Sequence, residues 1–191
     1  MKPHGWISGL FSTFKKTVGW YTIDSTLCIK PNELLGGFSF TSDGLPIISN
    51  SYCRGNVPFP VVSEDPDSIV GDNIFENSVI KRTIAPKTIP IPFEPLTFID
   101  SMIEMGNEAD TLTWLGSSTE GENVWLTLKN NLENIKNLVG SENYKSAIDQ
   151  IENFLSAVNE YYKNESKLIT DEGYALMYYN GKYVLEYLKQ H

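Results

Sequence analysis

The chain has 191 residues, of which 41% are hydrophobic and 20% are charged, a composition typical of globular proteins. Acidic residues outnumber basic ones by 24 to 15, and the few Lys and Arg form no stripe that could bind successive phosphates. No apolar run approaches the roughly 20 residues that cross a bilayer. We therefore expect neither nucleic-acid binding nor insertion into a membrane.

The first part of the chain, residues 1–62, carries short apolar stretches separated by turn residues. Their alternation and their β-branched or aromatic content predict strands over Ile7 to Phe14, Val18 to Ile23, Gly37 to Phe40 and Ile47 to Cys53. The alternative is a helix from Trp6 to Val18, because several apolar residues there also fit helical spacing. Glycines within and beside this segment favour the strand. These strands predict part of an antiparallel β-sandwich.

Residues 63–94 are predicted to form a proline-rich linker. Seven of the ten prolines lie between Pro58 and Pro95, and they exclude a long continuous strand. One short edge strand is predicted within Asn73 to Ile84, and the linker from Ile74 to Phe93 could be donated to another sheet. Because Ile89, Ile91 and Phe93 are too apolar to remain solvated, we expect the linker to lie against the domains.

From residue 95 onward the apolar period changes to that of a helix. Pro95 opens a first predicted helix, and Gly140 closes a second one that begins near Val124. A third is predicted to start at Ser141, and Thr170 is predicted to cap a fourth. Residues 95–191 therefore predict an antiparallel bundle of about four helices, which makes the fold class α+β.

A sequence motif in the third and fourth predicted helices resembles that of a known family. It runs from Ala147-Ile148-Asp149-Gln150-Ile151 through Leu168-Ile169-Thr170 to Tyr174-Ala175-Leu176, and it is similar to the FIMAH helical module. That module occurs at the C-termini of secreted and cell-surface proteins of bacteria and archaea, so the resemblance implies an extracellular or cell-surface location. The chain departs from the usual pattern at Tyr178-Tyr179-Asn180-Gly181, where small and aliphatic residues are expected.

A second sequence motif resembles the last strands of a β-sandwich in uncharacterised secreted proteins. In those proteins, a similar stretch precedes the same helical module. It comprises Ile29-Lys30-Pro31-Asn32-Glu33 and Gly37-Phe38-Ser39-Phe40-Thr41-Ser42. This resemblance implies further strands upstream. We therefore expect either that the chain is a fragment or mature product, or that the missing strands come from elsewhere.

Cys28 and Cys53 are the two cysteines, and both lie in predicted strands or at strand ends. Their spacing is compatible with a disulfide and equally with two separate thiols. A bridge would place the protein outside the cytosol.

Few residues in this chain indicate catalysis or ligand binding. The two histidines, His4 and His191, lie at opposite ends of the sequence, so a His-centred nucleophilic or zinc site is not expected. Oxygen ligands between Glu64 and Asp72 suit calcium, but their spacing is not that of an EF-hand. We predict no enzyme activity, no cofactor and no resident metal. Four tryptophans and ten tyrosines make carbohydrate a candidate ligand.

Together these features predict a non-catalytic extracellular structural or adhesion module. A partial sheet leaves backbone groups and apolar surface uncovered, so strand addition from a second copy or another surface protein could build a fibre. The alternative is an accessory module of a secreted hydrolase, which would bind carbohydrate or act as a spacer. The interface candidates are Ile7, Phe11, Phe38, Phe40, Ile89, Ile91 and Phe93.

Overall fold

The structure is a computed structural model. The structure describes residues 1–11, 17–30, 33, 35, 37, 41–53, 79–116, 123–163 and 167–191. They fall into two compact units, one formed by residues 1–42 and 51–81 and the other by 43–50 and 82–191. The sequence predicts a linker over 63–94 that is separate from the helices, whereas the contacts join the segments 43–50 and 82–94 to the helices. We call these the β unit and the bundle unit.

The β unit contains a short antiparallel sheet. Strand β1 (Ile7–Phe11) pairs with β2 (Thr17–Tyr21), and Gly9 lies opposite Gly19 at the centre of the ladder. Both strands were predicted, although β2 ends at Tyr21 rather than at Ile23. The alternative helix is wrong here, because its first residues form β1 and make ladder bonds to β2.

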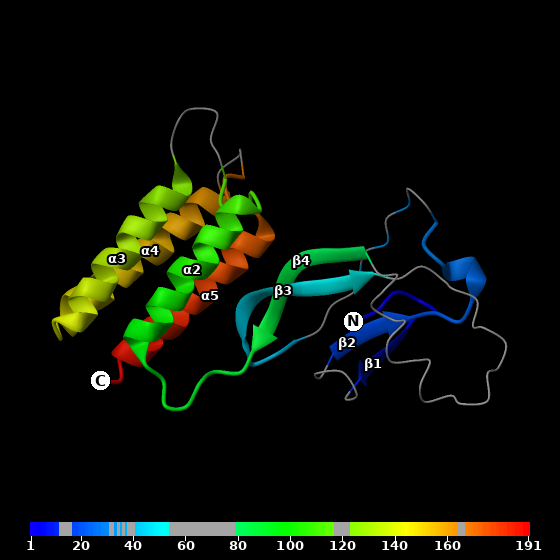
Figure 1. Cartoon of the computed structure of the whole chain (residues 1–191), viewed down its shortest axis with the longest axis horizontal. Coiled ribbons are helices and arrows are strands. Elements are labelled where there is room, and N and C mark those ends of the chain that lie inside the picture. Colours follow the sequence, from blue (N-terminus) through cyan, green and yellow to red (C-terminus); the bar gives the residue numbers. More distant parts are fainter. Residues whose placement is uncertain are drawn as a thin grey trace. The chain divides into compact units, whose positions relative to one another are not determined.

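A second two-stranded antiparallel sheet joins β3 (Leu45–Cys53) to β4 (Val79–Lys87) (Figure 1). Strand β4 begins within the region where a short edge strand was predicted, but it extends beyond Ile84 and includes Pro86. The strand predicted over Gly37 to Phe40 lies largely outside the described residues. The described strands form two separate sheets, so an α+β fold is confirmed but a sandwich is not.

Four helices form the bundle: α2 (Pro95–Thr111), α3 (Val124–Gly140), α4 (Tyr144–Lys163) and α5 (Asp171–Leu188). Each helix packs against the next one in the chain, and α2 also packs against α5, which closes the ring (Figure 1). Short connections make consecutive helices antiparallel neighbours. The predicted helical bundle is confirmed.

The helix ends follow elementary capping rules. Pro95 occupies the first turn of α2, where its missing N–H is not needed. The Thr170 hydroxyl accepts a hydrogen bond from Gly173 N at 3.2 Å, as the sequence predicted for the start of α5. Helix α4 begins at Tyr144 rather than at Ser141, because Ser141 caps the end of α3 and Glu142 turns the chain with a φ of 57°.

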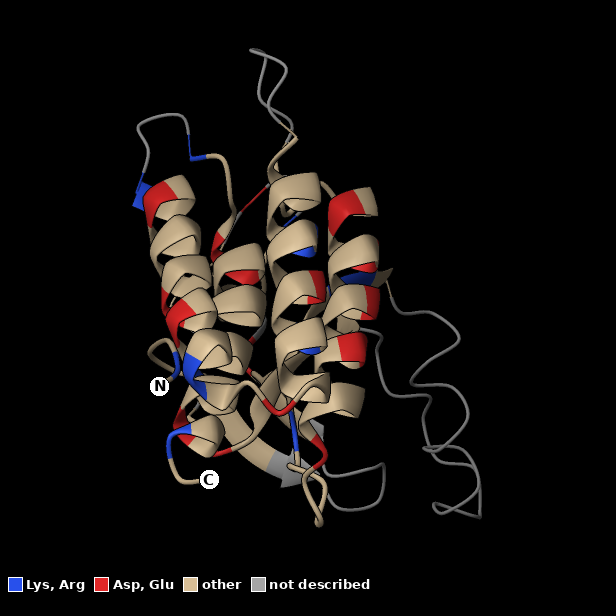
Figure 2. Ribbon diagram, turned by 90° about the vertical axis from the view of Figure 1, so that its left-hand side faces the viewer, with Lys and Arg blue, Asp and Glu red and all other residues tan. Residues whose placement is uncertain are grey.

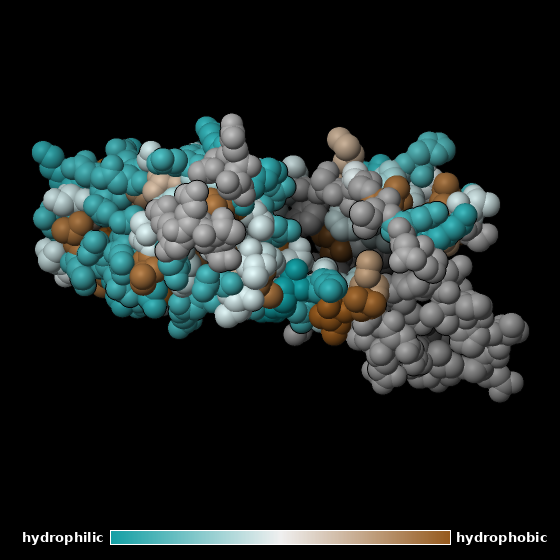
Figure 3. Space-filling model, turned by 90° about the horizontal axis from the view of Figure 1, so that it is seen from above, coloured by the Kyte–Doolittle hydropathy of each residue, from teal (hydrophilic) through white to brown (hydrophobic). Residues whose placement is uncertain are grey.

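The core lies between the four helices. Every described hydrophobic residue that is buried belongs to the bundle unit, and the largest include Phe154, Ile99, Met102, Leu128, Leu132 and Leu176. In contrast, none of the described residues of the β unit is buried. Hydrophilic residues cover most of the bundle face seen in Figure 3. The bundle therefore has a complete core of its own, whereas the described part of the β unit does not.

The contact between α2 and α3 depends on a glycine. The Trp125 ring covers Gly106, and its Nε1 donates a hydrogen bond to Asn107 Oδ1 at 3.1 Å. A Cβ atom at position 106 would lie 2.0 Å from the ring. Gly106 thus lets the two helices approach closely enough to bury the indole.

We expect Gly106→Ala to lower the free energy of unfolding by about 1–3 kcal/mol, because the added methyl group forces Trp125 out of its position. Gly140→Ala is the matched control, since the nearest atom to an added Cβ there is 3.9 Å away. Alanine at that helical position should be neutral or stabilise by up to about 1 kcal/mol. Urea unfolding followed by tryptophan fluorescence measures both changes, and equal effects would contradict the close contact.

Candidate association site

The structure places the predicted interface residues in environments that differ from one another. Ile7 is half-buried in β1, Phe11 ends that strand, and the side chain of Phe11 is not described. Phe38 and Phe40 lie outside the described residues. Ile89 is half-buried, whereas Ile91 is 95% exposed. The structure therefore does not bring these candidates into one described surface.

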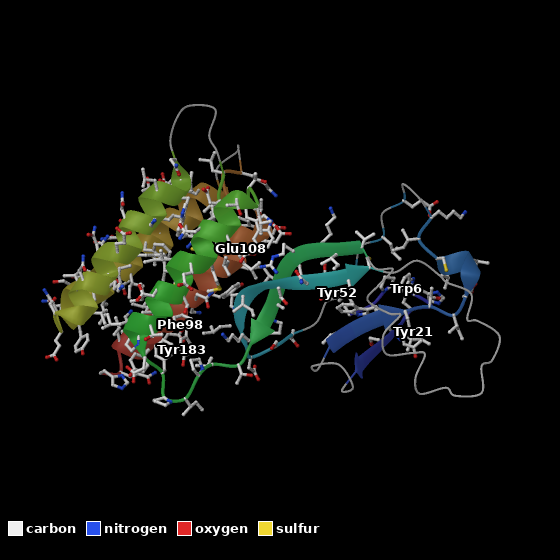
Figure 4. The ribbon with its side chains drawn as sticks, in the orientation of Figure 1. Trp6, Tyr21, Tyr52, Phe98, Glu108 and Tyr183 are labelled. Carbon is white, nitrogen blue, oxygen red and sulfur yellow. The ribbon has the colours of Figure 1, made fainter. Side chains whose placement is uncertain are left out.

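Phe93 packs within its own chain. Its ring lies 5.1 Å from that of Phe98, 4.9 Å from Tyr183 and 4.7 Å from Tyr187, measured between centroids. Figure 4 shows Phe98 and Tyr183 beside each other at one end of α2 and α5. This cluster fixes the segment that enters α2 on the bundle, so Phe93 stabilises the bundle unit rather than forming an open interface.

The part of the β3–β4 sheet around Pro46, Ile48 and Ile84 is held against the helices by apolar and polar contacts. Ile48 and Ile84 pack against the helical core. Asn180, which is fully buried in α5, donates through Nδ2 to the backbone oxygens of Pro46 and Leu176, both at 2.8 Å. The β3 strand is therefore held at Pro46 by a helix side chain in the way that a neighbouring strand would hold it.

A polar clamp lies farther along this sheet. Arg82 of β4 forms an ion pair and two hydrogen bonds with the Glu108 carboxylate of α2, and it also donates to Asn50 Oδ1 at 2.8 Å. Glu108 lies on the end of α2 that faces β4 (Figure 4). Both partners of the ion pair are more than a third exposed, so solvent screening limits its contribution to about 1 kcal/mol or less. The clamp positions β4 more than it stabilises the fold.

Asn180 also has a buried acceptor without a partner among the described residues, namely Oδ1. Pro46, whose carbonyl accepts from the same side-chain amide, has no N–H that it could donate to Oδ1. Leaving such a group unpaired costs about 1–3 kcal/mol.

We expect Asn180→Asp to destabilise the bundle unit by about 3 kcal/mol or more at neutral pH, because a buried carboxylate would face two carbonyl oxygens. Acidification should restore part of the loss, since the protonated carboxyl can donate one hydrogen bond. Thermal unfolding of the wild type and the variant at neutral and acidic pH measures this difference. Equal stability at neutral pH would contradict the burial of this amide.

Four tyrosines lie together on α4 and α5. The Tyr174 ring stacks on Tyr162 at 4.2 Å and on Tyr178 at 4.9 Å, and Tyr179 meets both Tyr174 and Tyr178 edge-on. The Tyr174 hydroxyl donates to Asn159 Oδ1 at 3.0 Å. Tyr179 is 52% exposed. We call Tyr162, Tyr174, Tyr178 and Tyr179 the tyrosine cluster.

Two hydroxyl groups of this cluster, those of Tyr162 and Tyr174, lose their protons less readily than a free tyrosine, because the pKa of each is raised. Burial raises the pKa of Tyr174, and the neighbouring Tyr178 and Tyr179 hydroxyls raise it further. The hydrogen bond that Tyr162 donates to Asp171 raises the pKa of Tyr162. Because neither hydroxyl loses its proton easily, Tyr162 and Tyr174 offer neutral donors and aromatic surface rather than a general base.

The two cysteines are not joined. Cys28 is half-buried, with its Sγ 3.8 Å from the backbone oxygen of Asp24, while Cys53 is exposed at the end of β3. Both belong to the β unit. The thiols are free in this structure, so a disulfide between them stays a prediction.

The described residues do not form a metal site or a substrate cavity. No group of three or more potential metal ligands occurs among them, and the segment proposed for calcium, Glu64 to Asp72, lies outside them. An apolar pocket of about 10 Å³ among the helices is lined by Ile99, Met102, Leu132, Ile135, Ile151, Phe154, Gly181 and Val184. A pocket of this size has no room for a substrate. No described helix is long and apolar enough to span a membrane.

Charge is unevenly distributed along the chain. Residues 95–191 contain 15 acidic and seven basic residues, whereas residues 1–62 contain three acidic and five basic ones. Figure 2 shows Asp and Glu spread along the bundle helices. The bundle is therefore strongly acidic, and the first part of the chain is slightly basic.

Comparison with protein-family models, with curated proteins and with solved structures finds no match. The resemblance to the FIMAH module stays a prediction. Its point of departure nevertheless coincides with a structural feature, because Asn180 contacts Pro46 and Tyr178 and Tyr179 belong to the tyrosine cluster. A polar residue within the apolar stripe of α5 was the signal that could have located the β3 contact. The Arg82–Glu108 pair had no comparable signal in the sequence.

Proposed function

We propose that this chain is a non-catalytic structural or adhesion module of an extracellular or cell-surface protein, and that it self-associates by strand addition. The main support for this proposal is the difference in buried apolar surface between the two units. The bundle unit buries a continuous apolar core, while the described β unit buries no residue and exposes apolar side chains such as Ile23 (86%) and Val79 (60%).

Backbone chemistry supports addition at the sheets. Each described sheet has two strands, and no described strand pairs with the outer edge of either one. An isolated two-stranded sheet is marginally stable, and a further strand adds backbone hydrogen bonds along its edge. A second copy of the chain brings the same two short sheets. Edge-to-edge pairing can then continue from copy to copy, which produces a filament when the contact does not close.

A non-catalytic role agrees with the bundle interior, whose small apolar void offers no polar group for chemistry. The extracellular or cell-surface location rests on the FIMAH resemblance alone. Oxidation of the free thiols in that environment could also link copies, because Cys53 is exposed at the end of a strand.

We expect the purified chain to give masses above that of the monomer, which increase with protein concentration. Size exclusion coupled to light scattering measures the mass, and the infrared amide band should show added β-structure as the mass grows. A mass that falls on addition of reductant would assign a covalent contribution to Cys28 or Cys53. A single monomeric mass at every concentration would overturn the proposal.

The tyrosine cluster supports a second candidate function, that of a carbohydrate-binding accessory module. Sugars pack against aromatic surface and accept hydrogen bonds at its edges, and Tyr179 presents such a surface at 52% exposure. Asn159 and Asp171 add polar groups beside the rings.

If this second function is correct, calorimetric titration with oligosaccharides of cellulose, chitin, xylan and mannan should show binding to at least one of them. Tyr179→Ala should then weaken that binding at least tenfold, because it removes the most exposed ring of the cluster. Tyr144→Ala provides the control, since this exposed tyrosine lies at the start of α4, outside the cluster. Absence of heat with all four sugars would count against carbohydrate binding.

A further inference from the structure

We infer that self-association exchanges the β3–β4 sheet between copies, so that β3 and β4 of one chain dock on the helical bundle of a second chain. The receiving surface is the part of α2 and α5 that carries Glu108 and Asn180, which the chain's own sheet occupies in this structure. This inference rests on the proposed function and identifies both the donated segment and the surface that receives it. Exchange of an identical element is a low-cost route to association, because every contact of the closed chain is made again.

The bundle does not need the β3–β4 sheet for its core. Every described hydrophobic residue that is buried lies between Ile99 and Leu188, whereas Ile48 and Ile84 are only partly buried and pack against this core from the sheet. Removal of the sheet therefore leaves the helices packed on one another. The sheet can leave one bundle and bind another without unfolding either.

The polar contacts that hold the sheet fix its position but oppose its release only weakly. The Asn180 amide donates to the Pro46 carbonyl at 2.8 Å, while its buried Oδ1 has no partner among the described residues. Water can satisfy this oxygen once the sheet has left, which lowers the cost of opening. The Arg82–Glu108 ion pair is more than a third exposed on both sides, and pairs of this kind contribute little stability.

The two strands are tied to each other and can move as one piece. Arg82 of β4 donates to Asn50 Oδ1 of β3 at 2.8 Å, and Ser51 Oγ donates to the backbone oxygen of Lys81 at 3.1 Å. The Pro46 carbonyl and the Arg82 guanidinium therefore reach a second bundle with the spacing that they have on their own bundle.

The connection between β4 and α2 favours exchange. It consists of residues 88–94, and Phe93 fixes its far end to the bundle by packing against Phe98. Pro90 and Pro92 restrict the backbone of this connection, and the residues before them favour extended conformations. A short, stiff connection limits how the sheet can return to its own bundle, and short hinge loops promote swapping between chains.

Charge supports the bundle of a second copy as the receiving surface. The strands β3 and β4 contain Lys81, Arg82 and Lys87 and no acidic residue. Residues 95–191 contain 15 acidic and seven basic residues. A basic sheet is attracted to an acidic bundle, and this attraction acts between chains as well as within one chain.

The first test asks whether position 82 of one chain lies beside position 108 of another. Two full chains, each with Cys28→Ser and Cys53→Ser, carry either Arg82→Cys or Glu108→Cys and are mixed at concentrations at which the wild type associates. A short bismaleimide then joins neighbouring thiols. We expect a crosslinked heterodimer, in which peptide mass spectrometry identifies a link between positions 82 and 108.

The matched control uses an exposed ion pair that lies within the bundle. Lys189 at the end of α5 pairs with Glu152 of α4 at 2.7 Å, and these helices are not exchanged in the inferred assembly. Chains with Glu152→Cys and Lys189→Cys, mixed in the same way, should give at least tenfold less heterodimer than the pair at positions 82 and 108.

A second measurement leaves every contact residue unchanged. Insertion of four Gly and Ser residues after Lys87 lengthens the connection and lets the sheet return to its own bundle. We expect the insertion to raise the dissociation constant for self-association at least tenfold, as measured by light scattering, with an unchanged melting temperature of the bundle in circular dichroism.

The outcomes separate this inference from the proposed function. Oligomers that crosslink no better through positions 82 and 108 than through the control pair would overturn exchange of the β3–β4 sheet, while leaving strand addition at another edge intact. An unchanged dissociation constant after the insertion would also overturn the exchange. A wild-type chain that is monomeric at every concentration would overturn both.

Discussion

The structure depends on the burial of one apolar stripe from each of four helices. At roughly 25 cal/mol per Å² of apolar surface, this burial is the main favourable term that opposes the entropy of ordering the chain. Phe154 and Leu176 are completely buried at the centre, and Gly106 lets Trp125 close the contact between α2 and α3. Because the four helices bury their own apolar stripes, the bundle unit does not require additional strands to complete its core.

The β3–β4 sheet shows how the bundle also organises a part of the chain that is not helical. Ile48 and Ile84 extend the core, and the Asn180 amide substitutes for a neighbouring strand at Pro46. This arrangement includes a cost, since Asn180 Oδ1 stays unpaired next to a residue without an N–H. Such buried polar contacts fix one position of a strand more than they add stability.

The backbone N–H and C=O groups of the β unit also need hydrogen-bond partners. Its short ladder, centred on Gly9 and Gly19, contains no buried residue among those described, and no described strand covers its two edges. Strand edges are sites of association unless charge, proline or a covering element protects them. The proposed self-association rests on this contrast between the described strands and the buried core of the bundle.

The sequence by itself determined the four helices, the starts of α2 and α5, and the existence of most strands. Helical periodicity, Pro95 and Thr170 are local signals, because capping and amphipathicity depend on residues only a few positions apart. What only the tertiary structure decided is which strands pair and what anchors them. The contacts of Asn180 with Pro46 and of Arg82 with Glu108 join residues distant in the chain, and periodicity carries no information about such pairs. For the same reason the sequence suggested a sandwich, whereas the described strands form two separate sheets.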